Sequence, residues 1–154
     1  MGYEKCRKEV AWSMGDPKQI TVDATIDNVA TVTDFVNEEL EKLGCSMKAQ
    51  MQIDVAIDEL FGNIAHYAYG SGSGTATVEV HGRKEEPAQV MVTFKDQGVP
   101  YNPLEKDDPD VTLSAEERQI GGLGIFMVKK SMDDVKYQYL DGHNILTLKK
   151  GLVI

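Results

Sequence analysis

The sequence predicts a single α+β domain in which one sheet carries helices on one face. Segments of strand periodicity alternate with segments of helical periodicity along the 154 residues, and no internal repeat is visible. A hydrophobic content of 42% supports a real core, and this length suits one domain, which we place over residues 1–154. The sheet is expected to be mixed and mostly antiparallel.

The first half of the chain predicts one strand followed by two helices. Residues 19–23 (QITVD) alternate apolar and polar side chains, as in a half-buried strand. Apolar residues at helical spacing predict a helix over about 25–43, with Thr25 as its cap and Gly44 as its stop. A second helix is expected over about 47–69, ended by the turn sequence GSGSG at 70–74.

The second half predicts four strands, one helix and a long polar loop. The loop over about 96–122 carries many acids and little periodicity, and loops of this length are commonly functional lids. Asp141-Gly142 is a typical tight-turn pair between the last two strands. The expected elements are strands at 76–83 and 88–95, a helix at 124–132, and strands at 135–140 and 144–150.

Composition and charge exclude several classes of protein. Sixteen Lys and Arg against twenty-five Asp and Glu give a formal net charge of −9, which offers no general attraction for nucleic acid or an anionic membrane. No apolar run approaches the roughly 18 residues that span a bilayer, and the N-terminus lacks the apolar core of a signal peptide. Cys6 and Cys45 form neither a disulfide framework nor a metal knuckle. We therefore expect a cytoplasmic protein.

The second predicted helix carries a polar stripe formed by Glu59, Asn63 and His66. Spacings of four and three residues place these side chains on one helix face. Asn offers a neutral oxygen to a hard cation such as Mg²⁺, and Glu can accept a proton. Taken alone, the stripe is better explained as a solvated helix face.

Two further motifs follow in the chain. Asp96 ends a strand and can accept a hydrogen bond from an exocyclic amine, and Gly98 lets the backbone approach a flat ring. Asp and Gly are also favoured in ordinary turns, which is the alternative explanation of this motif. The sequence IGGLG at 120–124 opens a helix, and free N–H groups at such a helix start can bind phosphate oxygens. It is not a Walker A loop, and its glycines could instead serve tight packing.

The order of the three motifs resembles the GHKL (histidine-kinase-like) ATPase superfamily over about residues 20–148. The matching residues are Glu59 and Asn63 for its N box, Asp96 and Gly98 for its G1 box, and Gly122 and Gly124 for its G2 box. Within the superfamily, the strings DELFGNIAHYAY, FKDQGVPYNPL and EERQIGGLGIFMVK are most similar to the anti-sigma-factor serine/threonine kinases of bacterial partner-switching systems. The resemblance implies a Bergerat α/β sandwich.

The resemblance also implies roles for the residues in the three boxes. Asn63 would coordinate the Mg²⁺ that bridges the ATP phosphates, and Glu59 would act as the base. Asp96 would hold the adenine amino group, with Gly98 beneath the ring. As a lid of about 99–121 closes, the phosphates would be cradled by the four residues that follow Ile120, namely Gly121, Gly122, Leu123 and Gly124.

Four further positions need separate comment. The G1 box of the superfamily usually has glycine where this chain has Pro100, which fixes φ and stiffens the hinge, a variant familiar in the anti-sigma branch. Either His66 or Tyr67 is expected to contact phosphate. Arg118 in the lid is expected to neutralise the triphosphate or to touch a partner.

The function implied is an ATP-binding serine/threonine protein kinase and anti-sigma regulatory factor. Its partners would be a sigma factor and an anti-sigma-factor antagonist, and relatives suggest a homodimer. Two alternatives stay open: a nucleotide-gated binding module without turnover, and an orphan histidine-kinase-type catalytic domain. Four methionines at helical spacing are expected to fill the core rather than contact a cofactor: Met47, Met51, Met127 and Met132.

Overall fold

The computed structural model describes residues 17–105 and 123–153, which form one sheet and a layer of helices. The strands are β1 (Lys18–Asp23), β2 (Thr75–Arg83), β3 (Gln89–Asp96), β4 (Asp134–Leu140) and β5 (His143–Gly151). The helices are α2 (Val29–Lys42), α3 (Met47–Tyr67) and α4 (Leu123–Ser131), with short 3₁₀ turns η1 (Ile26–Asn28) and η2 (Pro103–Glu105).

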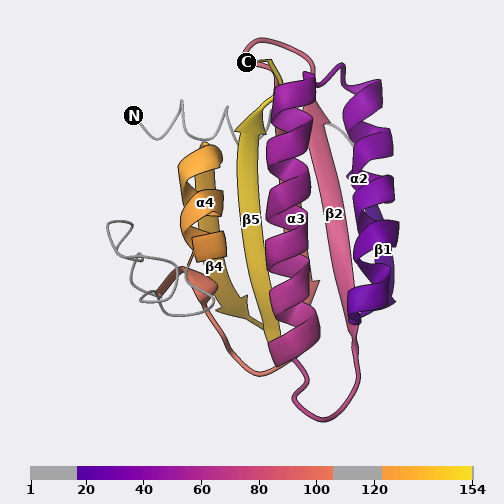
Figure 1. The fold of residues 1–154 in the computed structure, drawn as a ribbon, viewed down its shortest axis with the longest axis vertical. Coiled ribbons are helices and arrows are strands. Elements are labelled where there is room, and N and C mark those ends of the chain that lie inside the picture. The colour runs from indigo at the N-terminus through magenta and orange to yellow at the C-terminus, as the bar shows by residue number, and fades with distance from the viewer. Residues whose placement is uncertain (1–16, 106–122, 154) are drawn as a thin grey trace.

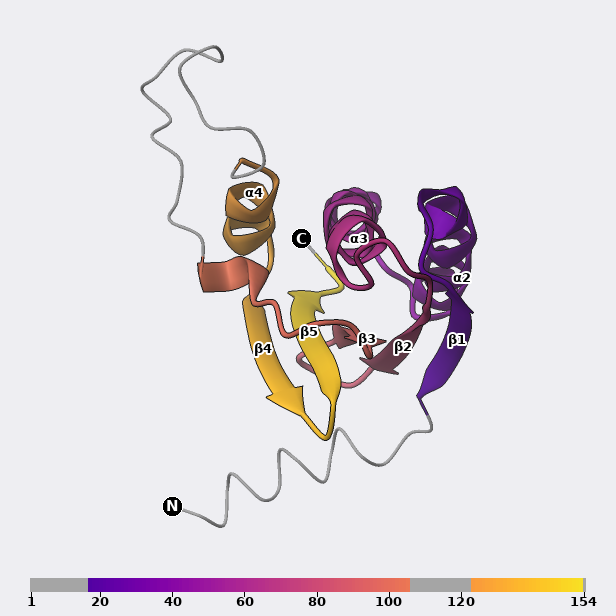
Figure 2. The ribbon, with the colours of Figure 1, turned by 90° about the horizontal axis from the view of Figure 1, so that it is seen from below.

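The five strands form one antiparallel sheet in the order β1-β2-β3-β5-β4. The three described helices all lie on the same face of this sheet, with α3 between α2 and α4 (Figures 1 and 2). The α+β class, the mostly antiparallel sheet and the single helical face predicted from the sequence are therefore confirmed. None of the described helices is both long and apolar enough to cross a bilayer.

The core lies between the sheet and the helices because alternate strand residues point toward the helical layer. Every second residue of β3 from Val90 to Asp96 is buried, as strand geometry requires. The helices contribute apolar faces, from Val32 to Leu40 in α2 and from Ile53 to Phe61 in α3. The largest side chains without solvent exposure include Phe61, Phe94, Leu40, Ile53, Ile57, Leu148 and Leu152.

The element boundaries agree with the sequence expectations to within two residues, apart from the first helix. There, Thr25 makes no side-chain cap bond and the chain first forms η1 before α2 begins at Val29. Ser46 does cap α3, by accepting a hydrogen bond from the Ala49 backbone N–H at 3.2 Å. Asp141 and Gly142 both have positive φ, 53° and 78°, as the tight turn between β4 and β5 requires.

The expectation that four methionines fill the core is wrong for three of them. Met132 is buried, but Met47, Met51 and Met127 are 77%, 62% and 50% exposed. The error arises because helical spacing shows only that residues share a face, not which face the sheet covers. In α3 the covered face is the one carrying Ile53 and Ile57.

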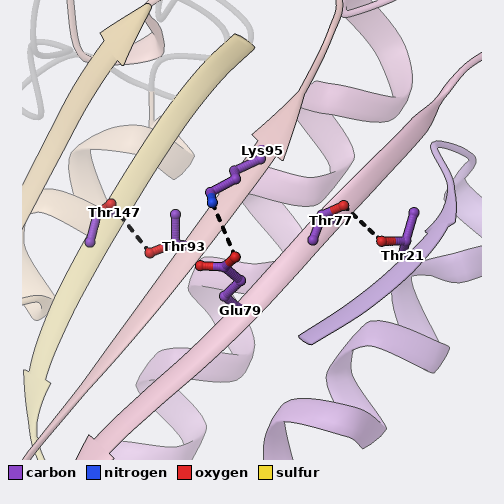
Figure 3. A network of polar contacts seen from close by, with 6 residues as sticks. All are labelled: Thr21, Thr77, Glu79, Thr93, Lys95 and Thr147. Carbon is purple, nitrogen blue, oxygen red and sulfur yellow. Dashed lines mark hydrogen bonds and ion pairs between the residues drawn. The ribbon is translucent and has the colours of Figure 1, made fainter. Parts of the chain in front are cut away.

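The sheet face opposite the helices is polar. Hydroxyl pairs link neighbouring strands across it, Thr21 with Thr77 at 2.8 Å and Thr93 with Thr147 at 3.4 Å (Figure 3). Between them the Lys95 ammonium contacts the Glu79 carboxylate at 3.0 Å. Such cross-strand pairs fix strand register on a face that none of the described helices covers.

Candidate functional site

A cavity lies between the C-terminal half of α3 and the adjoining ends of β3 and β5. It encloses about 430 Å³ of empty space, a figure that includes solvent at its mouth. Most of its wall is apolar or aromatic, and a few polar groups converge on it. The lining residues are Leu60, Asn63, Ile64, Tyr67, Ala68, Phe94, Asp96, Val99, Tyr101, Pro103, Tyr137, Asn144 and Leu146.

Asp96 is the acidic group in this wall. It is the last residue of β3 and is only 6% exposed. Its Oδ1 accepts hydrogen bonds from the Gly98 backbone N–H at 2.8 Å and from Asn144 Nδ2 at 2.9 Å. Among the described residues, no donor bonds to Oδ2. The buried carboxylate is thus held through one oxygen, while the other can accept a ligand hydrogen bond.

Gly98 fits closely against the end of α3. A Cβ at this position would come within 2.1 Å of the Ala68 carbonyl oxygen, which is backbone and cannot turn aside. The next residue, Val99, donates its backbone N–H to the same carbonyl at 2.9 Å. Glycine is required here because the chain must pass beside the helix end immediately after Asp96.

Asn144 is a site residue that the sequence analysis missed. It lies directly opposite Asp96 in the β3–β5 register and is 6% exposed. In β5 the side chains of residues 144, 146 and 148 all point toward the helical layer. A polar residue at a core-facing strand position, paired with the G1-box acid, was the signal available in the sequence.

Two polar side chains of α3 reach the cavity. Asn63 lines it, and no hydrogen bond to its amide is found within the described residues. Tyr67 also lines the cavity, and its ring lies 5.7 Å from that of Tyr101. His66 is exposed and lies outside the lining set, with its ring 6.0 Å from that of Tyr67. Tyr67 is therefore the better placed of the two residues considered for ligand contact.

Glu59 lies one turn before Asn63 on α3 and meets the start of α4. A Cβ on Gly124 would come within 2.2 Å of the Glu59 carboxylate carbon. The carboxylate therefore packs directly on the Gly124 backbone, which brings residues of the N box and the G2 box together.

Part of the predicted site lies outside the described residues. This is the case for Gly121, Gly122 and Arg118, and for residues 106–121 of the predicted lid. Leu123 begins α4. Residues 99–105 are described, and Val99, Tyr101 and Pro103 among them line the cavity.

The environment at the cavity rim perturbs one phenol. Burial is the main cause that raises the pKa of Tyr137, and the nearby Asp96 carboxylate adds to the effect. The Tyr137 hydroxyl donates to Asn144 Oδ1. The Tyr137 side chain is therefore present in the cavity wall as the neutral phenol.

Comparisons with known proteins agree with this geometry. The family model described as histidine kinase-like ATPase domain matches residues 22–150. The chain is 32% identical over 113 residues to the serine-protein kinase RsbW of Listeria innocua, covering 70% of each chain. It is 28% identical over 104 residues to the serine/threonine-protein kinase BtrW of Bordetella bronchiseptica, covering 67% of this chain and 71% of that one.

A solved structure shares the fold. The crystal structure of the RsbU and RsbW domains of Rv1364c from Mycobacterium tuberculosis superposes with a TM-score of 0.63 at 21% identity. The match covers 90% of this chain and 33% of that longer chain. With the family match over residues 22–150, these findings show that the chain belongs to the histidine kinase-like ATPase family and is similar to its RsbW-type protein kinases.

Proposed function

We propose that this protein is an ATP-dependent serine/threonine protein kinase that also acts as an anti-sigma factor. Its membership of the histidine kinase-like ATPase family supports nucleotide binding, and two relatives carry the name of serine or serine/threonine kinases. Two partners are proposed: a sigma factor, and an antagonist protein that would carry the phosphorylated Ser or Thr. Both rest only on the resemblance of the sequence motifs.

The observation that carries the proposal is the Asp96 carboxylate in the wall of an apolar cavity. Adenine is flat and largely apolar and has one exocyclic amine, so it suits a wall of Leu60, Phe94 and Leu146 with a single buried acceptor. Gly98 keeps the backbone beside Asp96 free of a side chain. These groups fit a purine with a 6-amino substituent.

The described residues also fit a nucleotide-bound Mg²⁺. This ion usually takes one or two protein oxygens, because phosphates and waters supply the rest. Asn63 offers such an oxygen beside the cavity. When bound there, Mg²⁺ would neutralise charge on the transferred phosphoryl group.

Glu59 is the proposed base. It would accept the proton of the Ser or Thr hydroxyl while the hydroxyl oxygen bonds to the γ-phosphorus and the bond to the ADP oxygen breaks. This role is supported by its position on α3, one turn before Asn63 and against Gly124 at the start of α4.

Nucleotide binding is tested by melting the protein with and without Mg²⁺-ATP. Ligand at about 100 times its Kd should add roughly 2.7 kcal/mol of stability. Asp96→Asn should abolish the shift because the substitution puts an amide N–H₂, which is a donor, where the ligand amine needs an acceptor oxygen. An absent shift in the wild type would contradict the proposal.

Phosphoryl transfer is tested with candidate antagonist proteins and labelled ATP, comparing wild type with Glu59→Gln. Loss of transfer with retained ATP binding is expected, since only the base is changed. Transfer that Glu59→Gln leaves unchanged would remove Glu59 from this role. ATP binding without transfer to any candidate would instead favour a nucleotide-gated binding module.

A further inference from the structure

Asn144 is the polar centre of the cavity wall. Its Nδ2 donates to Asp96 Oδ1 at 2.9 Å and to the Val99 carbonyl at 2.9 Å, with the Gly98 carbonyl at 3.5 Å. Its Oδ1 accepts from the Tyr101 backbone N–H at 3.1 Å and from the Tyr137 hydroxyl. Both amide protons and both lone-pair directions are therefore in use.

The chemistry of these partners fixes which way the amide faces. The Tyr101 backbone N–H can only donate, so the Asn144 oxygen must point to it. The Val99 carbonyl and the Asp96 carboxylate can only accept, so the nitrogen must point to them. An inverted amide would leave buried groups on both sides without partners, at a free-energy cost.

We propose that Asn144 is a specificity-determining positioning residue that selects the purine base by orienting Asp96. It binds Oδ1 of the carboxylate together with the Gly98 N–H, so Oδ2 is the oxygen left for a ligand donor. This inference rests on the proposed nucleotide function and adds to it a rule for base choice. A purine with an amine at position 6 donates a hydrogen bond to Oδ2. A purine with a carbonyl at that position is repelled, because the lone pairs of its oxygen face those of Oδ2.

Asn144 acts through Asp96 and through the chain that follows it. The same amide fixes the backbone of residues 98–101, which forms one side of the cavity. Removing the amide leaves Oδ1 with the Gly98 N–H alone, so the carboxylate can turn about this one bond and take up water. The contact with the 6-amine then loses its fixed direction, and discrimination falls.

The test measures Kd for ATP and for purine riboside triphosphate, which lacks only the 6-amine, in the full chain with Mg²⁺. The wild type should prefer ATP by about 10- to 100-fold, the range for a hydrogen bond to a charged group. Asn144→Ala should bring this ratio to within about threefold of unity. Tyr139→Phe, at an exposed position of β4 outside the cavity wall, should keep the wild-type ratio.

The outcomes separate the inference from the proposed function. If Asn144→Ala weakens both nucleotides equally and keeps the ratio, Asn144 is merely structural and the inference is overturned. Equal affinities in the wild type overturn it too, while ATP binding stands. Binding of neither nucleotide by the folded wild type overturns the proposed function, and the inference with it. Should Asn144→Ala fail to fold, Asn144→Val, a residue that suits a buried strand, gives the same test.

Discussion

The carboxylate of Glu59 rests on the backbone of Gly124, where a Cβ would come within 2.2 Å of both the carboxylate carbon and Oε2. This contact joins α3 to the first turn of α4. It sets the proposed base relative to the helix start that we expect to face the phosphates. Glycine permits the contact because it presents no side chain to the carboxylate.

Gly124→Ala should therefore impair phosphoryl transfer more than it impairs folding. The end of the Glu59 side chain can move to relieve the clash, so the fold survives while the carboxylate leaves its position. Transfer should fall by about 10- to 100-fold, within the contribution expected of a positioned base. Single-turnover phosphorylation of the antagonist measures this loss, and ATP titration checks that binding is kept.

The matched control is Gly62→Ala, another glycine substitution in a helix. A Cβ at Gly62 meets nothing within 4 Å, and helix propensity favours alanine by about 1 kcal/mol. This variant should be as active as the wild type and slightly more stable. Equal activity of Gly124→Ala and Gly62→Ala would contradict the assigned contact.

Gly98→Ala should destabilise the protein and weaken ATP binding together. Its Cβ would lie 2.1 Å from the Ala68 carbonyl oxygen, so either the helix end or the chain after Asp96 must shift. Overpacking of this kind costs about 1–3 kcal/mol. Chemical unfolding and ATP titration measure the two effects. Gln97→Ala, at the exposed neighbouring position, should change stability far less.

The fold was largely predictable because its strands and helices carry clear local patterns. The alternation in β3 and β5 and the Asp141-Gly142 turn are visible in single segments of sequence. The two hairpin pairings also follow, since short turns join β2 to β3 and β4 to β5. What the pattern does not contain is the covered face of each helix, and this is why Met47 and Met51 were misplaced.

The site was predictable only in part, for a different reason. Glu59, Asn63 and Asp96 belong to short motifs, so they stand out in the sequence. Asn144 stands 48 residues after Asp96, and its role depends on the strand pairing that sets it opposite that acid. A contact made by tertiary structure has no local signal beyond one polar residue at a buried position.

Tyr69→Phe should loosen the segment that carries Asp96. The Tyr69 hydroxyl donates to the Thr75 carbonyl at 2.6 Å and accepts from the Gln97 backbone N–H at 2.9 Å. Losing it leaves two backbone groups short of a partner, so the free energy of unfolding should fall by about 1–3 kcal/mol. Urea unfolding measures the change. Tyr139→Phe, 45% exposed on β4, is the control and should be neutral within about 0.5 kcal/mol.

Asp54 on α3 should make stability depend on pH. Burial is the main cause that raises the pKa of its carboxyl, while a hydrogen bond with Asn37 opposes the rise. Asp54 Oδ1 and Asn37 Oδ1 are both buried without a hydrogen-bond partner. The folded protein therefore binds a proton at Asp54 more tightly than the unfolded chain does. As pH rises through the window between the unfolded and folded pKa values, the free energy of unfolding falls.

Asp54→Asn should remove this dependence and stabilise the protein at pH 7–8. The new amide carries no charge to desolvate, and its N–H₂ can donate to the unpartnered Asn37 Oδ1. Solvent screening limits the gain to under about 1 kcal/mol. The gain should shrink as pH falls toward the unfolded pKa, where the wild-type carboxyl is neutral in both states. Urea midpoints at pH 4, 5.5, 7 and 8 would show it. Asp58→Asn, at an exposed position of the same helix, is the matched control, and a pH-independent difference between Asp54→Asn and the wild type would refute the assignment.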